Sequence, residues 1–310
     1  MAVELSSQLL VSNTLSGLVY GLMLGALASG LTLIWGVMKV VNLSHGYLVV
    51  TGMLTSVIFY KYILNVSPTL SPALAFVIGA LVGIAFYYSS LHLIIGKAET
   101  MTLKIEMSSL MSTFGFGILI LGIITFAVNR GWILSNEGLS GWTLSIHGKT
   151  YLEVAGTHLE YTKLLGAGLG VVLVLVTELF LRKTVWGLAI RAVAEDSRAV
   201  ALTGYDPVKV KLLTTIISTI MALIAGALYA IYLSSGISVG LESQIAPLSF
   251  VIVVLGGLGS LIGTLIGGLI IGLTYNITLA LTGHSEISLS VAFAILLIIL
   301  IVRPKGLFGR

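Results

Sequence analysis

Residues 164–211 decide the fold, and they read LLGAGLGVVLVLVTELFLRKTVWGLAIRAVAEDSRAVALTGYDPVKVK. The run at 164–182 is almost wholly apolar and has the length of about 20 residues that a membrane-spanning helix needs. The block at 182–211 carries six cations and three acids. Because such a block must lie in water, the stretch indicates a membrane helix that ends in a large polar connection.

The composition of the whole chain agrees with this. Of the 310 residues, 57% are apolar and 9% are charged, and the mean hydropathy is +1.10. Soluble domains carry about a quarter charged residues, so we expect an all-α polytopic membrane protein, organised as a single domain over residues 1–310. The net charge of +4 is attributed to membrane topology and not to a nucleic-acid partner, and the lack of cysteine excludes disulfides and cysteine metal sites.

Hydropathy predicts about eight full transmembrane helices and one short or re-entrant segment. The full spans are expected at 13–37, 44–62, 71–95, 108–128, 164–182, 211–235, 259–281 and 286–303, and the short segment at 245–257. If the short segment is a ninth crossing, 12 of the 16 cations lie on one side. By the positive-inside rule that side is the cytoplasm, so the N-terminus is expected outside and the C-terminus inside.

The largest external loop is expected at about 129–163. Apolar and polar residues alternate from Trp142 to Ile146, Gly148 and Lys149 offer a tight turn, and Tyr151 follows. This pattern predicts a small β-hairpin. The hairpin would either cap the helix ends or dock an external partner.

The cytoplasmic loop, at about 183–210, is expected to form two short helices around a turn. Gly187 is interpreted as a break after the preceding span, and apolar and charged residues alternate at helical spacing over 188–202. Gly204 suits a helix stop, and Asp206 and Pro207 suit the start of the next helix. Ordinary connections need only about two to eight residues, so we favour a partner surface over a plain solvated connector. The candidate contact residues are Arg191, Glu195, Asp196, Arg198, Gly204, Asp206 and Pro207.

A polar cluster of Asn42, Ser44 and His45 precedes the second span. Asn42 or Ser44 could cap that span. His45 is interpreted first as a hydrogen-bonded structural residue and second as a proton or substrate group. Glu178 and Arg182 have the spacing of an ion pair on one helix face.

Glycines at four-residue spacing are interpreted as helix-packing faces. They are Gly17, Gly21 and Gly25 in the first span, and Gly259, Gly263, Gly267, Gly268 and Gly272 around the span at 259–281. The chain has no G-x-x-x-x-G-K-[ST] phosphate loop and no HExxH motif. We therefore expect no catalytic residue, no metal and no cofactor on this chain.

The chain resembles, nearly end to end, the permease subunit of bacterial and archaeal branched-chain amino acid ABC importers, the H-type subunit of the Liv system. Residues 30–46, GLTLIWGVMKVVNLSHG, are similar to the family's first signature, residues 254–263, VLGGLGSLIG, to its second, and residues 303–310, RPKGLFGR, to its ending. Residues 194–205 are similar to its cytoplasmic coupling segment but depart from the Glu-Ala-Ala-x-x-x-Gly pattern of other importer permeases. Candidates for the translocation path, or for a structural polar cluster, are Asn42, Ser44, His45, Gly256, Gly257 and Gly259.

The resemblance implies a set of partners. They are a second similar permease, two cytoplasmic ATPases that bind the ATP, an external substrate-binding protein and membrane lipid. The cargo implied is a branched-chain or other hydrophobic amino acid. The alternatives are the same machine carrying urea or short-chain amides and, from another class, a passive channel or carrier.

Overall fold

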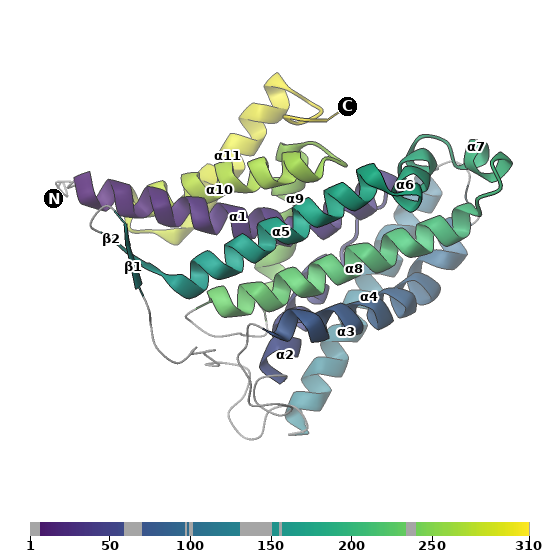
Figure 1. Ribbon diagram of the computed structural model, residues 1–310, viewed down its shortest axis with the longest axis horizontal. Coiled ribbons are helices and arrows are strands. Elements are labelled where there is room, and N and C mark those ends of the chain that lie inside the picture. Colours follow the sequence, from purple (N-terminus) through teal and green to yellow (C-terminus); the bar gives the residue numbers. More distant parts are fainter. Residues whose placement is uncertain are drawn as a thin grey trace.

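The computed structural model describes residues 7–58, 70–96, 98, 102–130, 151–154, 157–233 and 240–309, and nearly all of them are helical (Figure 1). Seven of the described helices are long and apolar enough to cross a membrane. They are α1 (Ser7–Met38), α3 with its continuation η3 (Ser71–Phe86 and Tyr87–Gly96), α4 (Leu103–Asn129), α5 (Tyr161–Lys183), α8 (Pro207–Tyr232), α10 (Leu261–Thr282) and α11 (Ser285–Val302). Two shorter apolar helices are α2 (His45–Ile58) and α9 (Leu241–Gly256). The predicted all-α polytopic fold is confirmed.

The described part of the second predicted span is a short helix. A full span is predicted at 44–62, but α2 has 14 residues. At 1.5 Å per residue it covers about 21 Å, less than the ~30 Å of bilayer hydrocarbon. Residues 59–69 lie outside the described part of the chain. The described structure therefore has seven long and two short apolar helices where eight full and one short are predicted.

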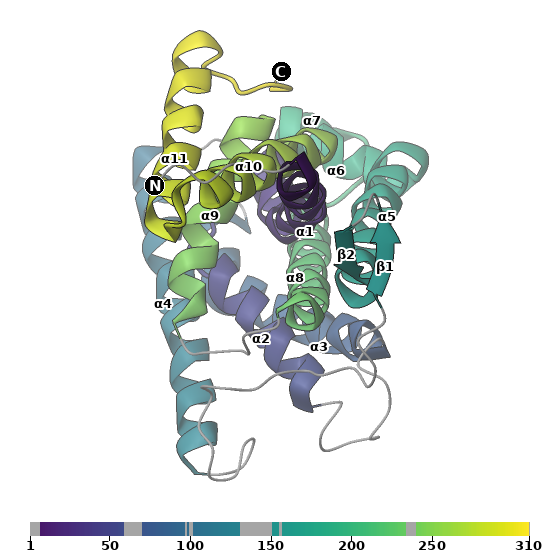
Figure 2. The ribbon, with the colours of Figure 1, turned by 90° about the vertical axis from the view of Figure 1, so that its left-hand side faces the viewer.

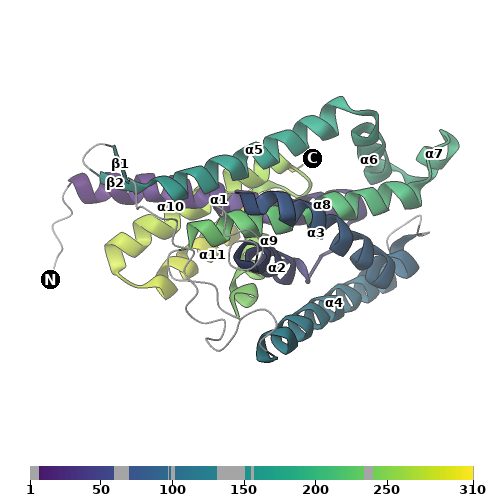
Figure 3. The ribbon, with the colours of Figure 1, turned by 60° about the horizontal axis from the view of Figure 1, so that its bottom comes forward.

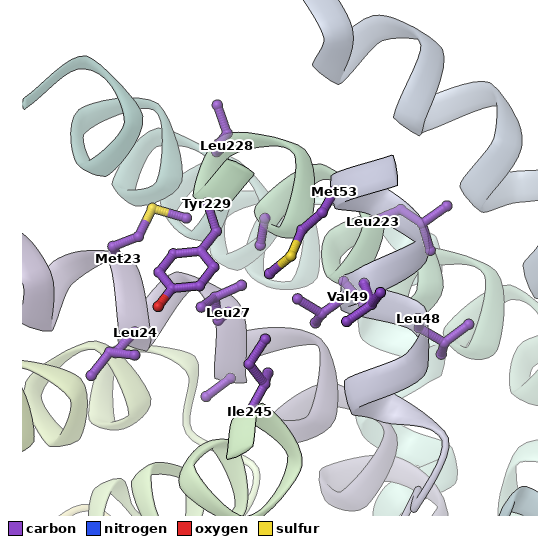
Figure 4. Close-up of a cluster of buried hydrophobic side chains, with 14 of the residues drawn as sticks. Met23, Leu24, Leu27, Leu48, Val49, Met53, Leu223, Leu228, Tyr229 and Ile245 are labelled. Carbon is purple, nitrogen blue, oxygen red and sulfur yellow. The ribbon is translucent and has the colours of Figure 1, made fainter. Parts of the chain in front are cut away.

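Helices α1 and α8 form the centre of the molecule. The most apolar window of α1 is 78% buried, whereas that of α11 is 11% buried. Figure 2 shows α1 and α8 nearly end-on, with other helices around them. Leu27 of α1, Leu48 and Met53 of α2, Leu223 of α8 and Ile245 of α9 belong to one buried core (Figure 4). Helices α4 and α11 leave large apolar surfaces exposed, which are available to lipid or to a partner helix.

The predicted glycine faces bring helix backbones into contact. A Cβ on Gly21 would lie 2.7 Å from the carbonyl oxygen of Gly268, and a Cβ on Gly25 would lie 2.9 Å from Cα of Leu265. These faces thus pack α1 against α10 in antiparallel orientation, which confirms the packing interpretation. Gly263 contacts the end of α9 instead.

A group of short helices joins α5 to α8. We call it the platform: it consists of α6 (Val185–Glu195), α7 (Ser197–Leu202) and the turn at 203–206. It lies at one end of the molecule, beyond the ends of α5 and α8 (Figures 1 and 3). We call this end of the molecule the platform end. The helix–turn–helix outline expected for this loop agrees with the structure.

Two details of the predicted platform are wrong. The single helix expected over 188–202 is divided at Asp196, which has extended backbone and separates α6 from α7. Gly187 is not the break after the span, because it lies within α6 and the break falls at Thr184. Gly187 is instead required by packing, since a Cβ there would lie 2.5 Å from Cα of Leu181.

The structure describes a hairpin at Tyr151–Glu160, within the loop expected at 129–163. Strands β1 (Tyr151–Val154) and β2 (Thr157–Glu160) pair antiparallel, with Tyr151 opposite Glu160. The predicted turn at Gly148 and Lys149 and the predicted strand before it lie outside the described residues. Helix α5 begins directly after β2.

Candidate functional site

Helices α6, α7 and α8 each begin at a side-chain cap. Thr184 Oγ1 accepts the N–H of Gly187 (3.0 Å), Asp196 Oδ1 accepts the N–H of Arg198 (2.8 Å), and Asp206 Oδ1 accepts the N–H of Val208 (2.9 Å). These bonds satisfy N–H groups that the first helical turns leave unpaired. Asp196 thus separates α6 from α7, because its carboxylate caps a new helix. The spacing of apolar residues alone predicts one continuous helix there.

The turn between α7 and α8 has the predicted geometry. Gly204 has a φ of +87°, in the left-handed region that glycine adopts without strain. Pro207 is the first residue of α8 and Asp206 caps it, as predicted. The ring of Tyr205 meets the ring of Trp186 edge-on at 5.9 Å, which ties the turn to the start of α6.

The outer surface of the platform is both charged and apolar. The four charged candidates on α6 and α7 are all exposed: Arg191, Glu195, Asp196 and Arg198. At the end of α7, Leu202 is 90% exposed, whereas Val200 is buried against the protein. Exposed apolar side chains rimmed by charges are typical of a protein-binding surface.

The first turn of α8 is bonded to the end of η3. Lys211 is 6% exposed, and its Nζ donates to the carbonyl oxygens of Ile95 (2.9 Å), Gly96 (3.4 Å) and Ala98 (2.8 Å). The Tyr87 hydroxyl donates to the carbonyl oxygen of Val208 (3.1 Å). Sequence analysis treated Lys211 only as one cation among six. No local pattern marks it, because the three carbonyls lie 113 to 116 residues earlier in the chain.

The chain between α1 and α2, at residues 39–44, is not helical. His45 Nε2 lies 2.9 Å from the carbonyl oxygen of Leu27. Leu27 is about 16 Å along α1 from its end at Met38, so α2 starts deep in the protein. Backbone that leaves the helix at this depth must be bonded by protein groups. Thr113 of α4 provides such bonds, since its Oγ1 accepts from the Leu43 N–H at 3.3 Å.

The polar cluster at the start of α2 is fully enclosed. Asn42 Oδ1 accepts the N–H (3.0 Å) and the hydroxyl (2.5 Å) of Ser44, so Asn42 orders the turn that leads into α2. The Leu27 carbonyl can only accept, so His45 Nε2 carries the proton in this contact and Nδ1 is left as an acceptor. Asn42 Nδ2 and His45 Nδ1 have no hydrogen-bond partner among the described residues. The cluster thus holds one unpaired donor and one unpaired acceptor.

The three family-like stretches meet at the platform end of the molecule. A Cβ on Gly36, in the first stretch, would lie 2.7 Å from Cα of Gly259, in the second. In the tail, the N–H of Leu307 donates to the carbonyl oxygen of Leu255 (2.9 Å), and the N–H of Phe308 donates to that of Gly256 (3.1 Å). The candidate glycines therefore lie at a backbone junction, and the Asn42 cluster does not belong to it.

These features define the class of the protein, a polytopic helical membrane protein with a non-helical connection between α1 and α2 and an exposed helical platform. The sequence comparisons give the family. Residues 13–302 match the family described as "Branched-chain amino acid transport system / permease component", and the chain belongs to that family.

Curated relatives match over almost the whole chain. The high-affinity branched-chain amino acid transport system permease protein LivH of Salmonella typhimurium is 24% identical, over 95% of this chain and 94% of that protein. LivH of Escherichia coli strain K12 is 25% identical, over 95% of this chain and 94% of that protein. The high-affinity branched-chain amino acid transport system permease protein BraD of Pseudomonas aeruginosa is 25% identical, over 97% of this chain and 96% of that protein. The family expected from the signature stretches is confirmed.

Proposed function

We propose that this chain is the permease of an ATP-driven importer for branched-chain or other hydrophobic amino acids. It forms half of the path together with a second permease, receives substrate from an external binding protein, and is driven by two ATPases that bind the ATP. Family membership and the names of the relatives support this role. Residues 1–310 act as one permease domain, and the chain itself catalyses no reaction.

In this proposal the platform end faces the cytoplasm, with the N-terminus outside. The support is the positive-inside rule together with the contacts that gather cation-bearing segments at one end. Lys211 at the start of α8 bonds the end of η3, and the tail bonds the end of α9. Their cations therefore share one end with those of the platform.

The observation that carries the proposal is the bonded route from the platform to the centre of the molecule. An ATPase bound at α7 and the turn would push on the first turn of α8. Lys211 and Tyr87 join that turn to η3, and α8 continues into the core at Leu223. Movement of the platform would thus shift α8 and η3 together. The proposed coupling residues are Arg191, Glu195, Asp196, Arg198, Gly204, Asp206 and Pro207.

The proposed path residues are those of the enclosed polar cluster, with the glycine junction as its support. An amino acid is a zwitterion, which presents donors at its ammonium group and acceptors at its carboxylate. Asn42 Nδ2 and His45 Nδ1 are an unpaired donor and an unpaired acceptor. Ser44 holds Asn42 in place. At the glycine junction, Gly259 packs against Gly36 of α1, Gly256 against Gly263 of α10, and Gly257 against the tail.

Assembly with the ATPases tests the coupling surface. We expect Leu202→Asp and Arg198→Glu to reduce co-purification of the ATPases with the permease pair, because each change opposes docking at the end of α7. Lys104→Glu, which makes the same charge reversal at an exposed residue of α4, is the control. Full assembly of both platform variants would refute the coupling assignment.

Uptake into proteoliposomes tests the cargo and the path. With the binding protein present, labelled leucine should accumulate only when ATP is enclosed, and His45→Gln should raise the leucine concentration needed for half-maximal uptake. Accumulation of urea in place of leucine would assign the chain to the amide-carrying alternative. Uptake that persists without ATP would make it a passive carrier.

A further inference from the structure

A groove of about 990 Å³ lies at the platform end, apart from the enclosed polar cluster. Its walls are the last turns of α1 and α5, helix α6, and the connection from α9 to α10. The candidate spans α1 and α5 end here, and α10 begins here at Leu261. The groove therefore lies at the level where the hydrocarbon of the membrane meets water.

Cations outnumber acids in the groove. Lys39, Arg182 and Arg191 line it together with Glu178 and Glu195. Arg182 and Glu178 form an ion pair at 2.5 Å, so their charges cancel. Lys39 and Arg191 are exposed and make no ion pair with another described residue. Two unpaired cations thus face one carboxylate, and the net charge of the groove is positive.

The wall beside these cations is apolar and continues onto the surface. Leu188 lines the groove and is 59% exposed. On the same helix, Val185 and Trp186 are also exposed, and on the opposite side the groove is lined by Leu258 and Phe308. Large exposed apolar side chains and a tryptophan at the end of a span are typical of the membrane interface.

We propose that this groove binds an anionic phospholipid, with its headgroup phosphate at Lys39 and Arg191 and an acyl chain along Leu188 and Trp186. A small soluble anion would leave the apolar wall uncovered, and an uncharged lipid would leave the two cations unpaired. An anionic phospholipid matches both surfaces, and such lipids are held by basic pockets between membrane helices. The site requires neither cargo nor ATP, so it can be tested apart from the transport role.

Lipid retention on the full-length chain tests the site. The chain is purified from nanodiscs that contain equal amounts of phosphatidylglycerol and phosphatidylcholine, and the bound lipid is identified by native mass spectrometry. We expect phosphatidylglycerol to be retained preferentially. Lys39→Gln and Arg191→Gln should each lower its retention roughly fivefold, because one cation near an anionic lipid surface contributes about 1 kcal/mol. Glu195→Gln should raise retention.

Matched variants distinguish a specific lipid site from general attraction between cations and anionic lipid. Lys104→Gln and Lys209→Gln remove exposed cations at the same end but outside the groove, and they should leave retention unchanged. The proposal would be overturned if the control variants lost as much phosphatidylglycerol as the groove variants. Equal retention of the two lipids by the wild type would also overturn it. Displacement of the lipid by inorganic phosphate would show a phosphate site without lipid selectivity and would also overturn the proposal. Because Arg191 and Glu195 are also proposed ATPase contacts, lipid retention is measured on the chain without ATPases.

Discussion

At the scale of single residues, Lys211 shows how an amino group is accommodated at the start of an apolar helix. Carbonyl groups at a helix end have no partner within the helix. Lys211 Nζ reaches three carbonyl groups at and just beyond the end of η3, from Ile95 to Ala98. One side chain therefore bonds three carbonyl groups around the end of η3, one of which, that of Ile95, also accepts the N–H of Ala98, and it fixes two spans relative to each other.

Replacing Lys211 tests this arrangement. We expect Lys211→Met, which keeps the length of the side chain but removes the donors, to destabilise the protein by about 1–3 kcal/mol, since buried carbonyls lose their partners. The thermal unfolding midpoint of the detergent-solubilised chain should fall by several degrees. Lys209→Met, at an exposed position two residues earlier, is the control. Equal midpoints for the two variants would mean that the buried bonds contribute nothing.

At the scale of elements, the short apolar helix α2 is held by close backbone contact with α8. A Cβ on Gly226 of α8 would overlap the carbonyl oxygen of Val49 of α2, and a Cβ on Gly52 would lie 2.6 Å from Cα of Leu223. Helices α2 and α8 thus cross with their backbones touching. Eleven of the 14 residues of α2 are buried, so this close crossing holds most of the helix in the core.

The crossing of α2 and α8 gives a prediction at this scale. Gly226→Ala should force the two helices apart, with a cost of about 1–3 kcal/mol from overpacking. Gly168→Ala in α5 makes the same change where the structure leaves open space, so it should be neutral or slightly stabilising. The amount of monodisperse protein recovered after mild heating measures the difference. A Gly226 variant as stable as the Gly168 variant would disprove the close crossing.

At the scale of the whole molecule, the C-terminal tail after α11 packs against the end of α9. Gly306 has a φ of +78° and lies against Val254 and Gly257 of the α9 region. The tail then bonds the carbonyl groups at the end of α9, and Phe308 reaches the groove beside α6. The last residues of the chain thus connect α11 to the platform end.

Substitution of Gly306 tests the contact of the tail with the end of α9. Gly306→Val is expected to release the tail, because the backbone is left-handed and the side chain would meet the carbonyl oxygen of Val254. Cleavage by trypsin after Lys305 should become faster. Gly283→Val carries the same backbone strain (φ +72°) with open space around it, and should leave that cleavage rate unchanged. An unchanged rate in the Gly306 variant would mean that the tail is held by other contacts.

The elements that could be predicted are those with strong local signals. The nine apolar helices follow from runs of apolar residues, and Gly204, Asp206 and Pro207 follow from the conformations those residues favour. The predictions failed where two local signals compete, as at Asp196, where a capping carboxylate overrides helical periodicity. For the hairpin, the predicted strand and turn lie outside the described residues, and the pairing of Tyr151–Val154 with Thr157–Glu160 was not predicted.

The sequence by itself determined that the chain crosses a membrane many times, that residues 183–210 form a capped helical connection, and that the chain belongs with the branched-chain amino acid permeases. These conclusions depend on composition, on neighbouring residues and on signature stretches, all of which can be read along the chain. Tertiary structure alone decided the rest: the burial of Lys211, the enclosure of His45 at Leu27, the contact of Gly36 with Gly259 and the cation-lined groove. Each of these joins residues that are distant in sequence, and packing in three dimensions selects such partners.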